Sequence, residues 1–99
     1  MTVHWSWKAI PDQVRLAADA DGRGVIVWED LTAVRRRVVM RTTLDGGRTL
    51  SPPQPLTQAV KAFAPDVVVA PGGFLVVWHE EQFPSVKTVI HSIKLQGAR

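Results

Sequence analysis

The sequence contains no cysteine, which excludes disulfide bonds and thiolate metal sites. It has no apolar run near the roughly 20 residues of a membrane-spanning helix. Its first ten residues lack the basic-then-apolar order of a secretory signal peptide. Tyrosine is also absent, so no phenol is available to any reaction. From these absences we expect no membrane association, and the cytoplasm is the default prediction for location.

Histidine is scarce, and the sequence shows no metal-binding pattern. His4, His79 and His91 are too scattered for the short spacings of a zinc site. Asp19 and Asp21 could be two carboxylates of a calcium loop, but the remaining ligands of such a loop are missing. The sequence therefore predicts neither a metal nor another cofactor.

Much of the net charge of +3 comes from one arginine cluster, Arg35, Arg36 and Arg37. Strands that bind nucleic acid combine basic and aromatic side chains on one face. In an extended strand, Arg35 and Arg37 point to one side and Arg36 points to the other. The cluster is therefore divided, and a solvated sheet edge explains it better than a nucleic-acid interface.

The residues that are present predict an all-β protein. The chain has 99 residues, enough for one domain. Its apolar residues form short β-branched runs such as Val25-Ile26-Val27-Trp28, separated by glycine and proline turns. No run keeps the 3.6-residue periodicity of a helix.

One pattern occurs twice along the chain. Segment 25–28 aligns with segment 75–78, and both end in tryptophan. Pro11-Asp12 is aligned with Pro65-Asp66, which gives a period of about fifty residues, the size of one four-stranded unit. The second strands are apolar on both faces, as in sheets stacked between two neighbours. The predicted strands are 13–18, 25–29, 35–44 and 50–56 in the first copy, and 67–70, 74–79 and 86–95 in the second.

Segment 43–50 predicts a tight turn. Asp45 is placed to accept backbone N–H groups, and the two glycines after it can take positive φ. Thr49 adds a hydroxyl to the same turn, and Leu50 is expected to fold back as an apolar plug. With extended flanks on both sides, this segment predicts a β-hairpin of about four turn residues.

The same segment resembles the Asp-box of sialidase-type (BNR) β-propellers, through Thr43, Asp45, Gly47, Thr49 and Leu50. Leu50 stands where the family usually has Trp or Phe. The resemblance implies a β-propeller of four-stranded blades, of which the repeat supplies two. It also implies that the Asp-box is structural and lies on the face away from the active site.

A propeller has about four to eight blades, so two blades imply a ring of several chains. Blade 1 would cover about 11–60 and blade 2 about 61–99. Residues 3–10 align with the strand after the Asp-box, and we expect them to complete blade 2 of a neighbouring chain. Three chains would give the six blades of sialidases, which favours a homotrimer. A dimer, a tetramer and a fragment of a longer propeller are the alternatives.

The resemblance places ligand binding on the face opposite the Asp-box, where acidic connections between strands would gather at the channel mouth. Arg15 matches the position of the family's first carboxylate-binding arginine, and we expect it to pair with an acid or to share an anion with its copies. Trp7 is a candidate for stacking on a sugar or for packing on a neighbouring chain. The candidate ligand-binding residues are Arg15, Asp12, Glu29, Asp30, Asp66, His79, Glu80, Glu81 and Trp7.

Catalysis is disfavoured by the lack of tyrosine. Sialidases use a Tyr nucleophile assisted by Glu, three Arg residues and an Asp acid/base. We therefore expect a non-catalytic propeller that binds a glycan or a small anion at the channel mouth or between blades. A sialidase-like or other glycoside hydrolase, with two acidic residues in the usual roles, is one alternative. A structural scaffold is the other.

Overall fold

The computed structural model describes residues 10–31, 35–57 and 61–95. This part of the chain is all-β, contains no helix, and confirms the predicted fold class at that level. It therefore has no helix that could cross a membrane. The strands are β1 (Ile10–Ala18), β2 (Gly24–Leu31), β3 (Arg36–Thr43), β4 (Gln54–Pro55), β5 (Ala62–Ala70), β6 (Gly73–Gln82) and β7 (Ser85–Ile93).

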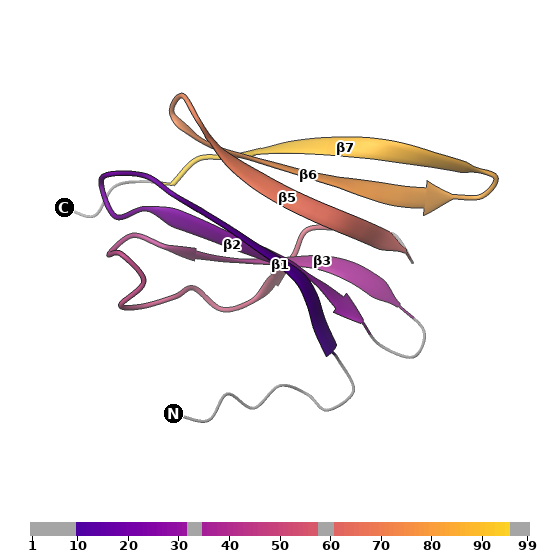
Figure 1. Cartoon of the computed structure of the whole chain (residues 1–99), viewed down its shortest axis with the longest axis horizontal. Helices are drawn as coiled ribbons and strands as arrows, with labels where there is room; N and C mark the ends of the chain where they lie inside the picture. Colours follow the sequence, from indigo (N-terminus) through magenta and orange to yellow (C-terminus); the bar gives the residue numbers. More distant parts are fainter. Residues whose placement is uncertain (1–9, 32–34, 58–60, 96–99) are drawn as a thin grey trace.

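The strands form two antiparallel sheets, each following the order of the chain. The first sheet has the order β1-β2-β3-β4 and the second has the order β5-β6-β7. In Figure 1 the sheets lie side by side, and β5 is the strand of the second sheet nearest to the first. The larger sets of contacts between the sheets all involve β5, which touches β1, β2 and β3. The strand predicted at residues 3–10 lies outside the described part except for Ile10, which begins β1 and pairs with Leu31.

The fourth strand is much shorter than predicted. β4 contains only Gln54 and Pro55, paired with Met40 and Val39. The expected hairpin of about four turn residues is wrong, because the connection from β3 to β4 runs over residues 44–53. Consecutive prolines at 52 and 53 explain why β4 begins only at residue 54, since neither has an N–H group to donate to a sheet ladder.

The two sheets repeat one register. Trp28 pairs with Val39 in the first sheet, and Trp78 pairs with Val89 in the second. Opposite each tryptophan, the inner strand carries a bulge that contains a residue with positive φ. That residue is Gln13 (φ 53°) in β1 and Ala64 (φ 54°) in β5.

The bulges correct the sequence alignment of the inner strands. Asp12 pairs with Glu29, and Phe63 pairs with His79 at the equivalent place, so Asp12 corresponds to Phe63. The structural counterpart of Asp66 is therefore Arg15. Aligning the two Pro-Asp pairs was wrong by three residues, because the hydrogen-bond register, rather than residue identity, sets which positions correspond.

The hydrophobic core lies between the sheets. Each sheet presents one face to it, because successive side chains of a strand point to opposite sides. Trp78, Phe74 and Val76 are almost fully buried. The buried core cluster consists of Val25, Val27, Val38 and Met40 from the first sheet, and Ala62, Val67, Phe74, Val76, Trp78 and Ile93 from the second.

Candidate functional site

The turn at residues 43–50 is held by side-chain hydrogen bonds in place of a regular strand ladder. The Thr43 hydroxyl donates to Asp45 Oδ1 over 2.8 Å and accepts the Gly47 N–H over 2.9 Å. Thr49 donates its N–H to Asp45 Oδ1 and its hydroxyl to Asp45 Oδ2, over 3.0 and 2.7 Å. Gly46 and Gly47 have φ of +74° and +92°, conformations that other residues rarely adopt.

The hydrogen bonds of this turn favour the charged form of Asp45. The N–H and the hydroxyl of Thr49, together with the hydroxyl of Thr43, lower the pKa of Asp45 from its ordinary value to about 2. All its short contacts hold the turn itself. Asp45 is therefore suited to a structural role, as the resemblance implies.

Leu50 does not plug the core between the sheets. Its exposed fraction is 36%. It lines a cavity of about 230 Å³ together with Leu16, Gly24 and Ile26 of the first sheet. The connection from β3 to β4 carries Leu50 to the side of the first sheet that faces away from the core, where it lies beside Leu16 and Ile26.

Glu29 and Asp30 lie within β2, not in the loop that the sequence predicted. Glu29 is buried, and its Oε2 accepts the backbone N–H of Ala64 in the β5 bulge over 2.7 Å. Its Oε1 is 3.5 Å from Nε of Arg36. Asp30 Oδ2 pairs with Arg37 Nη2 over 3.4 Å. Glu29 thus joins the two sheets, and Asp30 joins β2 to β3.

Glu80 also lies within a strand, β6, and its buried carboxylate is bonded to other side chains. Its Oε2 accepts the Thr57 hydroxyl over 2.6 Å and the Trp78 indole N–H over 2.9 Å. Its Oε1 is 3.8 Å from Lys87 Nζ. These groups, led by the Thr57 hydroxyl, lower the pKa of Glu80 despite burial, which acts in the opposite direction.

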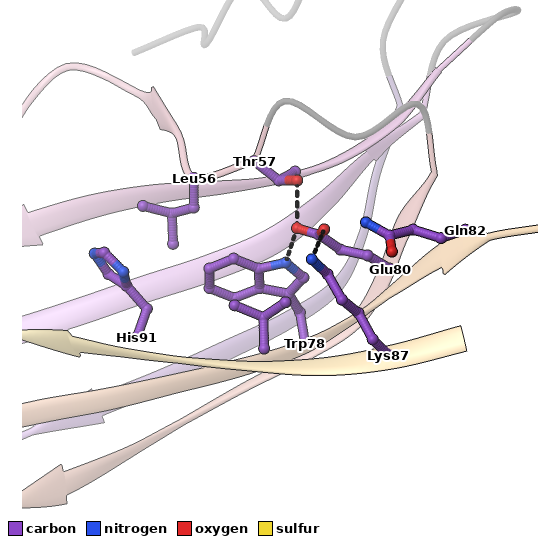
Figure 2. A pocket seen from close by; sticks show the side chains of 8 residues that line it. Leu56, Thr57, Trp78, Glu80, Gln82, Lys87 and His91 are labelled. Atoms are coloured by element: carbon purple, nitrogen blue, oxygen red, sulfur yellow. Dashed lines mark hydrogen bonds and ion pairs between the residues drawn. The ribbon is translucent and has the colours of Figure 1, made fainter. Parts of the chain in front are cut away.

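Glu80 forms part of the floor of an open cavity of about 470 Å³. Figure 2 shows Trp78 and Glu80 at its centre, with Lys87 and His91 entering from β7 and Thr57 from the segment after β4. Lys87, His91 and Gln82 are exposed, so their donors are available at the opening. The cavity is lined by Leu56, Thr57, Trp78, Glu80, Gln82, Lys87, Val89 and His91.

The remaining acidic and imidazole candidates make local contacts. His79 Nδ1 is 3.0 Å from the Thr88 hydroxyl, and its ring lies against Phe63. Glu81 Oε1 is 3.5 Å from Lys61 Nζ. Both residues belong to β6, whereas the predicted strand ended at His79 and left Glu81 outside it. The predicted second strand stopped at residue 79, because a run of polar residues suggested that the sheet ended there.

The inner strands carry the other candidates. Asp12 and Asp66 accept the N–H of the next residue, over 2.9 and 2.8 Å. Arg15 is exposed, and its Nη1 donates to the Val14 carbonyl oxygen over 3.1 Å. Within the described part of one chain Arg15 has no carboxylate partner, so the expected pairing with a local acid is not met there. Trp7 lies outside the described residues.

The structure thus separates the sequence-predicted residues. Among the candidates in the described part, only Glu80 lines the cavity of about 470 Å³. The other described candidates lie on β1, β2, β5 and β6 outside it. Sequence reasoning missed Thr57, Lys87 and Gln82 as cavity residues. It assigned Trp78 and His91 to the core or an edge. Register alone could have grouped Trp78, Glu80 and Gln82, because alternate residues of a strand share a face.

Among the described residues, no group of three or more acidic, histidine or cysteine side chains could hold a metal ion. Comparisons with protein families, with curated proteins and with solved structures found no match.

Proposed function

We propose that this chain is a two-blade unit of a sialidase-like Asp-box β-propeller that binds a small anionic or sugar ligand between its blades without catalysis. The observation that carries the proposal is the cavity of about 470 Å³ between the second sheet and the segment after β4. Exposed donors from Lys87, His91 and Gln82 surround its opening, and Trp78 lies in its floor.

Two features support the propeller architecture. The sheets contact each other mainly through β5, and the cavity opens toward β7 on the far side. Radial sheets around a central channel have this wedge shape, with inner strands close together and outer strands apart. The Asp-box turn, with Asp45 bonded to both Thr43 and Thr49, is the second feature.

The chemistry of the cavity favours a ligand that carries negative charge or several hydroxyl groups. Lys87 is about half exposed and only 3.8 Å from its partner Glu80, so its ammonium can turn to an added anion. His91 and Gln82 add further hydrogen-bonding groups at the opening. Leu56 and Val89 supply apolar wall beside them, as small-molecule sites require.

Binding is favoured over hydrolysis by the state of the carboxylates. A general acid for glycoside cleavage needs a raised pKa. Glu80 has a lowered pKa, because Thr57 and Trp78 donate to it. Glu29 is occupied by the Ala64 N–H and by Arg36. Glu80 is therefore held as the anion and is not prepared to give a proton to a leaving group.

The proposal is tested by NMR titration with N-acetylneuraminic acid, a carboxylated sugar, and with neutral N-acetylglucosamine. Amide signals of residues 82, 87 and 91 should shift with the carboxylated sugar and move much less with the neutral one. Lys87→Met should abolish these shifts. Lys61→Met is the matched control, because Lys61 pairs with Glu81 away from the cavity.

Three results would contradict this function. Shifts that cluster on β1 around Arg15 would move the site to the channel mouth. Release of the aryl group from an aryl-glycoside at a rate that depends on Glu80 would support the hydrolase alternative. Amide signals that do not shift with either sugar would favour the structural-scaffold alternative.

A further inference from the structure

The second sheet leaves an apolar face uncovered. We call the face of each sheet that points away from the core its outer face. On the outer face of the second sheet, Val68, Leu75 and Ile90 are 53%, 36% and 68% exposed. They come from three adjacent strands, since Val68 pairs with Leu75 and Ile90 pairs with Val77 beside it. Such a continuous apolar face on a sheet is typical of an interface.

The repeat shows what this face is built to contact. Because the two sheets share one register, each position in one sheet has an equivalent position in the other. The exposed residues of the second sheet are equivalent to residues of the first sheet that pack onto the second sheet in the core. The equivalent pairs are Ala17 with Val68, Val25 with Leu75, Val27 with Val77, and Met40 with Ile90.

The outer face of the first sheet is equivalent in turn to the core face of the second sheet. Leu16 is 65% exposed on it and corresponds to Val67, which is 5% exposed in the core. The other equivalent pairs are Ile26 with Val76, Trp28 with Trp78, and Val39 with Val89. This face of the first sheet is open around Leu16, whereas Trp28 and Val39 on it are each only 3% exposed. The chain therefore presents both halves of its own internal interface buried in the core, and again on the second sheet and at the Leu16 end of the first.

The sizes of the side chains are complementary across the open pair of faces. Gly24 of the first sheet stands at the position equivalent to the buried Phe74 of the second. A cavity of about 230 Å³ lies beside Gly24, between Leu16, Ile26 and Leu50. On the outer face of the second sheet, Val68 and Leu75 stand at the positions that the smaller Ala17 and Val25 hold in the first sheet. A loss of volume on one side is thus matched by a gain on the other, as close packing requires.

The polar groups are consistent with the same contact. In the core interface Glu29 accepts the N–H of Ala64 in the β5 bulge. The equivalent N–H in the β1 bulge belongs to Gln13 and is already accepted by Asp12. The position equivalent to Glu29 is His79, so the outer face of the second sheet has no carboxylate there. None is required, because the Gln13 N–H already has an acceptor in Asp12.

We propose that the outer face of the second sheet of one copy packs onto the outer face of the first sheet of another copy. The occupant is a second copy of this chain, because each open face is matched by the other open face of the same sequence. The contact joins two different surfaces, so it propagates from copy to copy until a ring closes. This inference uses the blade repeat of the proposed architecture but not the ligand cavity.

The test uses two variants of the full chain, each blocking one face. Leu16→Lys places a charge on the outer face of the first sheet, and Val68→Lys places one on the outer face of the second. Sedimentation velocity should give an assembly for the unchanged protein and a monomer for each variant alone. An equimolar mixture should form a one-to-one dimer and nothing larger, because one intact face remains on each variant.

Val69→Lys is the matched control. Val69 neighbours Val68 on β5 and is 52% exposed, but it lies on the other face of the sheet. It should keep the mass of the unchanged protein. Dissociation of this control, a monomeric unchanged protein, or a Leu16→Lys variant that still self-associates would each overturn the proposal. The last result would show that association does not depend on the outer face of the first sheet.

A footprinting measurement on the unchanged protein covers the case in which a variant fails to fold. Carbene labelling of Leu75 and Ile90 should fall on assembly relative to a dilute sample. Equal labelling in both samples would overturn the proposal. The sugar titration separates this result from the proposed function, because the cavity lies within one chain and its signals should shift even in monomeric variants.

Discussion

At the scale of the residue, three carboxylates have lowered pKa values for structural reasons. Asp45 is held by the Asp-box hydroxyls, and Glu80 by Thr57 and Trp78. The pKa of Asp19 is raised by burial, its largest influence, but hydrogen bonds from Asp21 and Arg23 and the Arg23 charge lower it overall. The hydrogen bonds that stabilise these anions also fix turns and strand contacts, so acid should weaken the fold at these points.

Asp45→Ala should destabilise the protein, because the N–H and hydroxyl of Thr49 lose their acceptor. The folded pKa of about 2 lies below the ordinary 3.8. The stabilisation is therefore complete above pH 4 and is lost as pH falls toward 2. Urea denaturation of both proteins between pH 7 and pH 2 should show curves that converge in acid.

Asp21→Ala is the control for that series. Asp21 has an exposed side chain, and its ion pair in the described part is with Arg23, over 3.3 Å. It should change stability little at any pH. An Asp45→Ala variant as stable as the unchanged protein would refute the structural role of the Asp-box carboxylate.

Thr57→Val should cost about 1.5–3 kcal/mol, the usual contribution of a hydrogen bond to a charged group. The substitution removes the hydroxyl that donates to Glu80 Oε2 at 2.6 Å while keeping the side-chain shape. It should also raise the pKa of Glu80 toward its ordinary value, since that hydroxyl is the largest cause of the lowering. Carbon-13 NMR of the Glu80 carboxyl would follow this change.

Thr88→Val is the matched control for the hydroxyl. Thr88 lies on β7, is exposed, and bonds His79 rather than a carboxylate. It should cost about 0.5 kcal/mol or less, as exposed substitutions usually do. Equal losses for the two threonine variants would show that the Glu80 contact has no special weight.

At the scale of the element, the bulged inner strands decide how the sheets meet. The bulge of β5 turns the N–H of Ala64 toward Glu29, which ties the second sheet to the first. The bulge of β1 repeats this geometry with Gln13. Both bulges place a non-glycine residue in the left-handed region, which costs about 1–2 kcal/mol per residue.

Ala64→Gly should therefore raise the free energy of unfolding by up to about 1 kcal/mol, the relief of strain exceeding the extra freedom of glycine in the unfolded chain. Ala62→Gly, two residues earlier in the same strand, is the control and should destabilise, because Ala62 is fully buried in the core. Chemical denaturation measures both. A loss of stability in Ala64→Gly would mean that the positive φ at this bulge is not strained.

At the scale of the whole molecule, the described part exposes two features that favour association between chains. Both sheets have apolar outer faces, and in the described part no strand pairs with the far edge of β7. Exposed edges and apolar faces of this kind promote association. Face packing between copies and a strand supplied by residues 3–10 would remove both liabilities together.

Deleting residues 1–9 should abolish the ring and give monomer or aggregate, because the edge of β7 would keep no partner strand. Light scattering on the intact protein should give about 33 kDa, three times the 10.9 kDa of one chain, if six blades close the ring. A deletion variant with the mass of the intact assembly would show that the face contact is sufficient and that strand exchange is not required.

The sequence by itself determined the strand content, the two equivalent second strands that contain Trp28 and Trp78, and the hydrogen bonds of the turn at residues 43–50. These depend on residues close together in the chain, such as Thr43, Asp45 and Thr49. The positions of β2, β3, β6 and β7 followed to within a few residues, because β-branched runs and turns are local signals.

Only the tertiary structure decided the inner-strand register and the candidate site. The bulges at Gln13 and Ala64 shift the register by an amount that no local pattern encodes. The cavity joins Thr57 to Glu80 across 23 positions of the chain, so it exists only after the sheets pack. Glu29 and Glu80 looked like loop acids because charge usually marks solvent; here hydrogen bonds from distant segments make their burial tolerable.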